Sequence, residues 1–95
     1  MKVVMTENII RVEASSNYCR VYFDNEYPLT VAKLLHWFED HLPEEFFYRI
    51  HRTHIVNRKF VTEISTNSKL RLINGEQLQV SRRKKGVIMR MAVAV

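Results

Sequence analysis

The sequence predicts a mainly β fold of small antiparallel sheets, with one packed α-helix. Two segments, 8–14 and 18–23, alternate between apolar and polar residues, which is the pattern of half-buried strands. An Asn74-Gly75 pair separates two further alternating segments and predicts a β-hairpin. One segment, 30–42, repeats apolar residues at helical spacing. Because nothing repeats and no Gly/Ser/Pro-rich linker divides the chain, we expect residues 1–95 to form a single domain.

The strands follow from which side chains share a face. We expect three apolar residues to be buried in each of the first two strands: Ile10, Val12 and Ala14, then Cys19, Val21 and Phe23. Asp24-Asn25 predicts a turn into a third strand over 26–29, and apolar patterning predicts two more strands over 46–50 and 60–64. In the hairpin, Asn74 and Gly75 are the residues expected to take the two positive φ values of a type I′ turn.

The helix is predicted to begin after Thr30, which can cap it, and to end before Pro43. Its apolar stripe contains Val31, Leu34, Leu35, Phe38 and Leu42. Its outer face has no excess of positive charge, so we interpret it as structural. A short C-terminal helix is predicted after Ser81, with Val87, Ile88 and Met91 facing inward.

The start of this second helix is crowded with positive charge from residues 82–85, which opposes the helix dipole. Two interpretations remain open: a phosphate group docks there and relieves the repulsion, or fraying and solvent screening dissipate it.

Composition narrows the function. The net charge is +5, and two segments, 49–59 and 81–90, hold nine of the 15 Lys and Arg residues but no Asp or Glu. Such segregation favours a polyanionic partner, since clustered Lys and Arg neutralise phosphates and release counterions. No apolar run is long enough to span a bilayer, and the single Cys19 is typical of a reducing cytoplasm.

Catalysis and metal binding find little support. No phosphate-binding loop or pair of catalytic carboxylates is present, and Cys19 falls on an apolar strand face where a thiol is usually inert. His51 and His54 are three residues apart, which on one strand would point them to opposite faces, and no Cys pair or carboxylate completes a tetrahedral zinc set. We therefore expect no enzyme activity, cofactor or metal, and we expect His51 and Asn57 to hydrogen-bond and fix loop backbone.

Three ordered blocks resemble one family. The segment FYRIHRTHIVN matches its motif F-x-R-x-H-R-[ST]-x-x-V-N through Phe47, Arg49, His51, Arg52, Thr53, Val56 and Asn57. A second block, NGEQLQVSRR, matches N-G…L-x-V-S-R-R through Asn74, Gly75, Leu78, Val80, Ser81, Arg82 and Arg83. Upstream, IIRVEASSNYCRVYF looks like the first strands. The chain thus resembles, over about residues 8–86, the LytTR DNA-binding domain, an output module of bacterial two-component response regulators.

The resemblance implies an elongated fold that meets double-stranded DNA through loops and reads bases in the major groove. It places base contacts at Asn17 or Tyr18, at Arg52 and at Arg83. The chemistry of arginine agrees, since its planar fork can bind guanine O6 and N7 together. We expect phosphate contacts from Arg49, Thr53, Arg58, Lys59, Ser81, Arg82, Lys84 and Lys85. For Arg49, whose side chain shares a strand face with Phe47 and His51, a purely structural role stays open.

We also expect a homodimer on tandem DNA elements but a mostly monomeric chain in solution, because no long apolar stripe remains once the core residues are assigned. The single Cys19 and the lack of a spanning apolar run favour the cytoplasm and not a membrane. The resemblance further implies a receiver or sensor domain, which family members usually carry. A receiver or sensor partner would lie outside this chain, which is then either an excised output domain or a stand-alone regulator. One alternative class remains: a β domain that binds single-stranded nucleic acid by stacking bases on Tyr18, Tyr22 and Tyr48.

Overall fold

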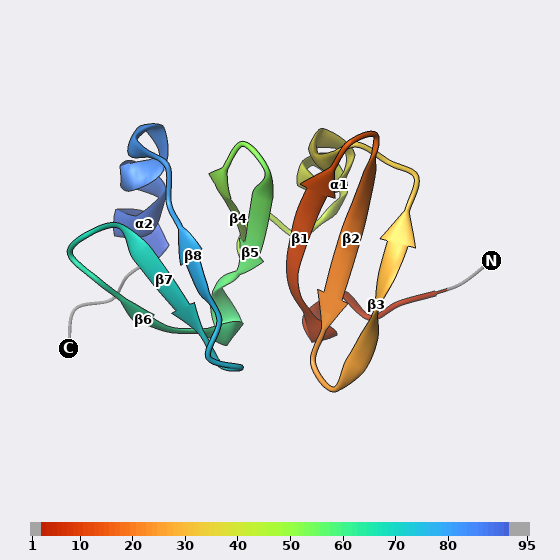
Figure 1. Cartoon of the computed structure of the whole chain (residues 1–95), viewed down its shortest axis with the longest axis horizontal. Coiled ribbons are helices and arrows are strands. Elements are labelled where there is room, and N and C mark those ends of the chain that lie inside the picture. The colour runs from red at the N-terminus through yellow and green to blue at the C-terminus, as the bar shows by residue number, and fades with distance from the viewer. Residues whose placement is uncertain (1–2, 92–95) are drawn as a thin grey trace.

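The computed structural model describes residues 3–91, in which eight strands and two α-helices follow one another along the chain (Figure 1). The elements are β1 (Ile9–Ser15), β2 (Tyr18–Phe23), β3 (Glu26–Val31), α1 (Leu35–His41), β4 (Phe47–His51), β5 (His54–Asn57), β6 (Val61–Ile64), β7 (Lys69–Leu72), β8 (Gln77–Gln79) and α2 (Lys85–Met91). Short 3-10 turns lie at Thr6–Asn8, Arg58–Phe60 and Arg82–Lys84.

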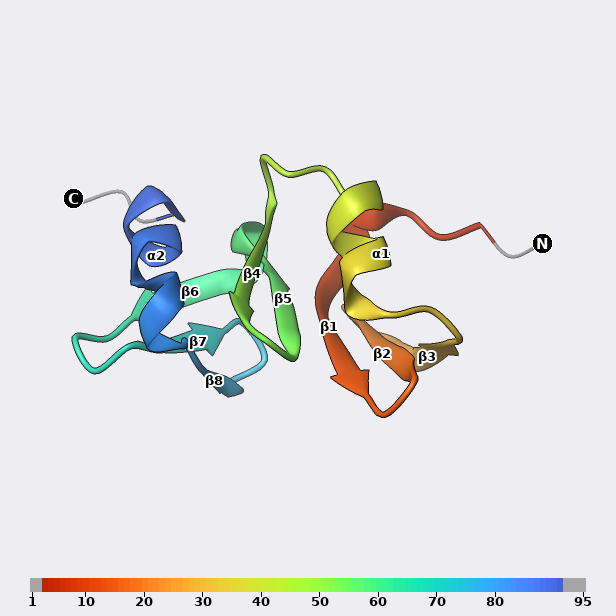
Figure 2. The ribbon, with the colours of Figure 1, turned by 90° about the horizontal axis from the view of Figure 1, so that it is seen from above.

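The strands form two antiparallel sheets. The larger sheet has the order β3-β2-β1-β5-β4, and the smaller has the order β6-β7-β8. The molecule measures 41 × 26 × 21 Å, and the two sheets follow each other along its long axis (Figures 1 and 2). The prediction of an elongated, mainly β fold is confirmed.

Two apolar cores cover both faces of the central strands. The first lies between the larger sheet and α1, and includes Val12, Cys19, Phe38 and Ile55. The second joins the larger sheet to the smaller sheet and α2, and includes Ile10, Ile50, Val56, Leu70 and Ile88. Adjacent residues of β5 therefore enter opposite cores, so this strand has no exposed face.

The burial of both faces corrects the prediction for the first strand. Val12 and Ala14 do face the first core, but Ile10 belongs to the second. A bulge between Ile9 and Arg11 shifts the register against β2, which puts Ile10 out of phase with Val12. The predicted buried residues of β2, Cys19, Val21 and Phe23, are confirmed. Cys19 is fully buried, and burial raises the pKa of its thiol.

The predicted helix over 30–42 is too long by one turn. Thr30 and Val31 belong instead to β3, where they pair with Arg20 and Cys19 of β2. Leu34 has extended backbone angles and is 50% exposed, so it neither continues the helix nor enters the core. Thr30 and Val31 thus make strand hydrogen bonds that they would lose in a helix, and α1 begins only at Leu35.

The hairpin at Asn74-Gly75 exists, but its turn is not type I′. Only Gly75 has a positive φ, of 90°. The Leu72 carbonyl accepts from the Gly75 N–H at 2.9 Å, and the Leu72 N–H donates to the Glu76 carbonyl at 2.8 Å. These bonds enclose a three-residue loop with glycine in its left-handed position, the second most common hairpin connection. Asn74 contributes its side chain: Oδ1 accepts from the Glu76 N–H at 3.0 Å.

The predicted C-terminal helix is present in two parts. Ser81 precedes a 3-10 turn over Arg82–Lys84 without a side-chain capping bond, and α2 follows from Lys85. Ile88 is buried in the second core, as predicted. The side chains of Val87 and Met91 lie outside the described part of the structure.

A buried arginine joins the two sheets. The Arg11 side chain is 7% exposed, and its guanidinium pairs with Glu76 of the β7–β8 hairpin at 2.9 Å and with Glu13 at 2.8 Å. The Tyr22 ring lies 3.7 Å from the guanidinium carbon. Burial alone would lower the pKa of Arg11, but its hydrogen bonds to the two carboxylates outweigh burial and raise it. The hydrogen bond from Arg11 likewise lowers the pKa of Glu76.

We predict that Glu76→Ala destabilises the fold by about 1–3 kcal/mol, because it leaves the Arg11 charge poorly compensated. This loss of unfolding free energy is smaller than that expected for a fully buried ion pair because the Glu76 side chain is 39% exposed. Urea unfolding measures the change. Glu63→Ala is the matched control: its ion pair with Arg71 spans 3.9 Å between exposed side chains, and its loss should cost under about 0.5 kcal/mol. Equal losses in the two variants would contradict the bridging role of Arg11.

Candidate nucleic-acid interface

Three segments that the sequence singled out lie at one edge of the molecule. They are the β1–β2 turn, the β4–β5 turn and the stretch from Ser81 to Lys84, and Figure 1 shows all three along its upper edge. The middle segment holds the outer two in place: the Ala14 N–H donates to the Thr53 carbonyl at 2.8 Å, and the Ser81 N–H donates to the Ile50 carbonyl at 2.9 Å. The predicted base-reading residues therefore share one edge.

The β4–β5 turn consists of Arg52 and Thr53, between the paired residues His51 and His54. Two-residue hairpin loops usually have a positive φ at their first position, which suits the twist of the strands. Neither Arg52 nor Thr53 has one. The turn is instead held by side chains: the Arg49 guanidinium donates to the carbonyls of His51 at 3.4 Å and of Arg52 at 2.7 Å.

The two histidines do not point to opposite faces, as the sequence spacing suggested, because they sit on two strands joined by a tight turn. Their rings are 6.0 Å apart, and both Nδ1 atoms lie 2.9 Å from Thr53 Oγ1. His51 Nδ1 also accepts from the Thr53 N–H at 3.3 Å. At the other end of β5, the buried Asn57 donates to the Ile9 carbonyl and accepts from the Lys59 N–H, both at 3.0 Å.

The predicted contact residues differ in exposure. Arg52, Arg82, Arg83, Lys85 and Asn17 are exposed, whereas Tyr18, Ser81 and Lys84 are half-buried. Within the part of the chain that the structure describes, the exposed arginine side chains at 52, 82 and 83 make no hydrogen bond or ion pair. Their donors therefore remain available to an external acceptor.

Arg58 and Lys59 lie elsewhere. They follow β5, and the Arg58 N–H donates to the Phe46 carbonyl beside the start of β4. This is the end of the larger sheet opposite the β4–β5 turn (Figure 1). The structure thus does not bring these two predicted phosphate contacts together with Arg52 and Arg83.

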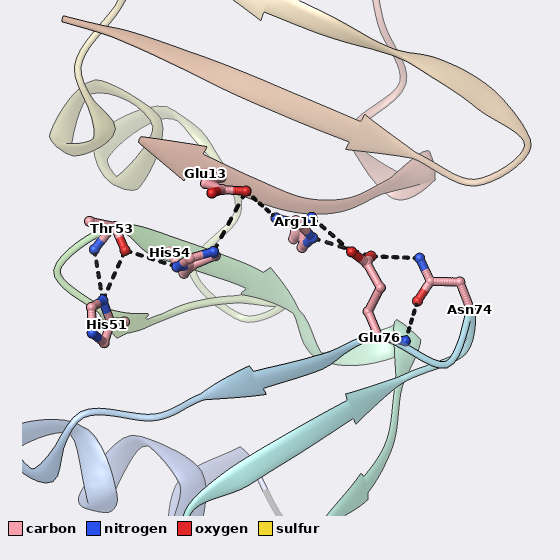
Figure 3. A network of polar contacts seen from close by, with 7 residues as sticks. All are labelled: Arg11, Glu13, His51, Thr53, His54, Asn74 and Glu76. Carbon is pink, nitrogen blue, oxygen red and sulfur yellow. Dashed lines mark hydrogen bonds and ion pairs between the residues drawn. The ribbon is translucent and has the colours of Figure 1, made fainter. Parts of the chain in front are cut away.

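A chain of polar contacts runs from the sheet-joining Arg11 to the β4–β5 turn, as Figure 3 shows. Glu13 pairs with Arg11 and lies 3.8 Å from His54 Nε2, while the other ring nitrogen of His54 contacts Thr53. Burial is the largest cause that lowers the pKa of His54, and the neighbouring Arg11 also lowers it, whereas Glu13 opposes both. No sequence pattern indicates this link, because Arg11 and Glu76 are 65 residues apart.

The described residues give little support to other kinds of functional site. Among residues 3–91, no group of three or more His, Cys, Asp or Glu side chains is arranged to hold a metal ion. No helix in the same part of the chain is long and apolar enough to cross a membrane. The chemistry that this edge offers is hydrogen-bond donation by exposed cationic side chains on a fixed backbone.

We predict that stability falls through His54 over the pH range just below 6.5, the ordinary pKa of histidine, because the pKa of His54 is lowered in the folded chain. Its lowered pKa means that the unfolded chain takes up the proton first as the pH falls, which favours unfolding. Below that range, loss of the Glu76 carboxylate should add to the decline, since its pKa is also lowered. Unfolding free energies at stepped pH values test this. His54→Asn should flatten the upper part of the curve, while the same change at the exposed His36 should not.

Comparison with known proteins identifies the family of this chain. The sequence model of the LytTr DNA-binding domain matches residues 1–92. Among solved structures, one described as the LytTr DNA-binding domain of a protein assigned as a methyl-accepting/DNA response regulator from Bacillus cereus is similar, with a TM-score of 0.82 and 29% identity. The match covers 93% of this chain and 84% of that one. A search of curated proteins gives no significant match. Because the family match spans nearly the whole sequence, the chain belongs to the LytTR family of DNA-binding domains.

Proposed function

We propose that this chain binds double-stranded DNA sequence-specifically and regulates transcription in the cytoplasm, as the output module of a response regulator or as a stand-alone regulator. The observation that carries the proposal is the common edge formed by the β1–β2 turn, the β4–β5 turn and the Ser81–Lys84 stretch. The 41 Å long axis corresponds to roughly 12 base pairs at about 3.4 Å each. One such edge can therefore follow about one turn of duplex.

Base reading is assigned to the centre and to the two sides of this edge. Arg52 and Arg83 are exposed and carry the forked donors that suit guanine in the major groove. Asn17 is exposed in the β1–β2 turn, beside Ser16, whose φ is 57°. Its amide can pair with adenine N6 and N7, while the half-buried Tyr18 presents a hydroxyl.

Phosphate contacts are assigned first to the residues that flank Arg83, namely Ser81, Arg82, Lys84 and Lys85. A contact from the hydroxyl of Thr53 would have to compete with the two histidine rings that share it. Arg58 and Lys59, at the opposite end of β5, would meet DNA backbone only where a bent duplex reaches around the sheet. Phosphate positioning thus centres on the Ser81–Lys85 segment.

Single-stranded binding is the weaker proposal. The tyrosines that would stack bases are all half-buried, and the Tyr22 ring already faces the Arg11 guanidinium at 3.7 Å. The tyrosine that is fully exposed, Tyr27 at 94%, lies on the edge strand β3 away from the three loops. A stacking platform needs exposed aromatic faces along one groove, so the arrangement favours a duplex.

We further propose that two copies bind tandem elements as a homodimer formed on DNA, with a receiver or sensor partner supplying the signal. The observation behind the monomer in solution is that few large apolar residues are exposed: Val3, Met5 and Tyr27 line one hollow, and Leu34 and Ile73 are not part of it. DNA would therefore bring the copies together.

The function is tested by selecting duplexes from a randomised pool and comparing the selected sequence as duplex and as single strands. We expect the duplex to bind at least tenfold more tightly and without any metal. Log K should fall against log salt at a slope of about −3 if Arg82, Lys84 and Lys85 meet phosphates, and of about −4.5 if a bent duplex also reaches Arg58 and Lys59. Equal binding of single strands would favour the alternative class. A slope near zero, or loss of binding in the presence of a chelator, would contradict the electrostatic contact or the absence of a metal, respectively.

Base reading and phosphate holding should separate by mutation. Arg52→Ala and Arg83→Ala should each cost roughly 1–3 kcal/mol on the selected duplex and little on random duplex, because each removes a fork that matters only at the right base. Lys84→Ala should weaken both duplexes alike and reduce the salt slope by about one. Lys59→Ala tests the opposite end of the sheet in the same titration. If Arg83→Ala weakened both duplexes by the same factor, Arg83 would be a phosphate contact.

A further inference from the structure

We infer that Arg49 is a positioning residue, which sets the place of the base-reading Arg52 and does not itself contact phosphate. The inference rests on the proposed role of Arg52 and extends it to the residue that builds its turn. Arg49 carries one of the cationic groups of the basic segment 49–59, so charge alone would assign it to the DNA backbone. Its contacts point to a different task.

All three Arg49 nitrogens are engaged within the protein. Nε and Nη2 donate to the carbonyls of His51 and Arg52, and Nη1 pairs with Glu39 of α1 at 3.1 Å. The Arg49 side chain is 25% exposed, so it lies mostly beneath the turn. These bonds use three of the five guanidinium N–H groups, so only two donors on a mostly covered side chain are left for a phosphate.

These bonds are directed at the backbone on which Arg52 is mounted. Three carbonyls at the turn accept hydrogen bonds from outside it: those of His51 and Arg52 accept from the Arg49 side chain, and that of Thr53 accepts from the Ala14 N–H. Because the loop lacks the positive φ that favours a two-residue hairpin, its geometry depends on such external donors. The Arg52 side chain is left exposed, with its base-reading fork free to face outward.

Glu39 is the third partner of the Arg49 guanidinium. It comes from α1, so it ties the turn to the helix that covers the first core and fixes the Arg49 guanidinium in the plane that reaches both carbonyls. Lysine at position 49 would keep the charge but would offer a single ammonium centre instead of a planar fork. Charge and geometry can therefore be separated by one substitution.

The test is a double-mutant cycle of Arg49→Lys with Arg52→Ala. Binding is measured to a duplex selected from a randomised pool by the unmodified chain, and to a random duplex. We expect Arg49→Lys alone to reduce the ratio of selected to random affinity by about five- to tenfold and to leave the salt slope unchanged. In the Arg52→Ala background the same change should alter the ratio by less than about twofold, since the residue it positions is gone.

Glu39→Ala supplies a second arm, with Asp40→Ala as the control of equal charge on the same helix. If Arg49 positions the turn, Glu39→Ala lowers the affinity ratio and Asp40→Ala does not. If Arg49 contacts phosphate, Glu39→Ala frees it and tightens binding to both duplexes. The inference is overturned by that result, by an Arg49→Lys effect that persists undiminished beside Arg52→Ala, or by Arg49→Ala reducing the salt slope by about one on both duplexes.

Backbone ¹⁵N relaxation of the free protein keeps this inference distinct from the proposed function. Arg49→Lys should increase the mobility of the amides of residues 51–53 while leaving those of β2 unchanged, and unchanged mobility at 51–53 would overturn the inference without any DNA. If no duplex is selected from the pool, the proposed function fails and the relaxation measurement alone decides the role of Arg49.

Discussion

Burying the Arg11 charge between two sheets is the constraint on which the arrangement of this molecule depends. A guanidinium that is 7% exposed is tolerable only when carboxylates compensate it, and the chain supplies them from two places. Glu76 comes from the β7–β8 hairpin, where Asn74 donates to its carboxylate at 2.7 Å. Glu13 comes from β1 itself and lies next to His54. One charge thus fixes the smaller sheet against the larger and orders the polar groups behind the β4–β5 turn.

Much of the fold could be predicted because several strands have one buried and one solvent-exposed face. In β2, Cys19, Val21 and Phe23 alternate with polar residues. The Asn74-Gly75 pair predicts the β7–β8 hairpin whichever type of turn the loop adopts. The candidate site could be placed in outline because Arg52 and Arg83 lie in short motifs of the family to which the chain belongs, and their contact with DNA stays a prediction. Local patterns and motifs were sufficient there because each depends on neighbours in sequence.

The rest depends on contacts that no local pattern reveals. β5 was not predicted as a strand, since Ile55 and Val56 enter different cores and leave no alternation. The helix was extended too far because Val31 fits a helical stripe as well as it fits a strand beside Cys19, and only the pairing with β2 decides. The same limit hid the bond between Arg49 and Glu39, which joins a strand to a helix ten residues away.

The buried thiol of Cys19 offers a way to measure how often the larger sheet opens. It is the only thiol in the chain, it is fully buried in the first core, and burial raises its pKa, so both access and ionisation are suppressed in the closed state. Alkylation therefore proceeds only through states in which β2 has separated from the residues that pack over it in the first core. The rate at which a thiol reagent modifies the native protein therefore measures opening of the larger sheet beside the β1–β2 turn, since Cys19 directly follows Tyr18 at the start of β2.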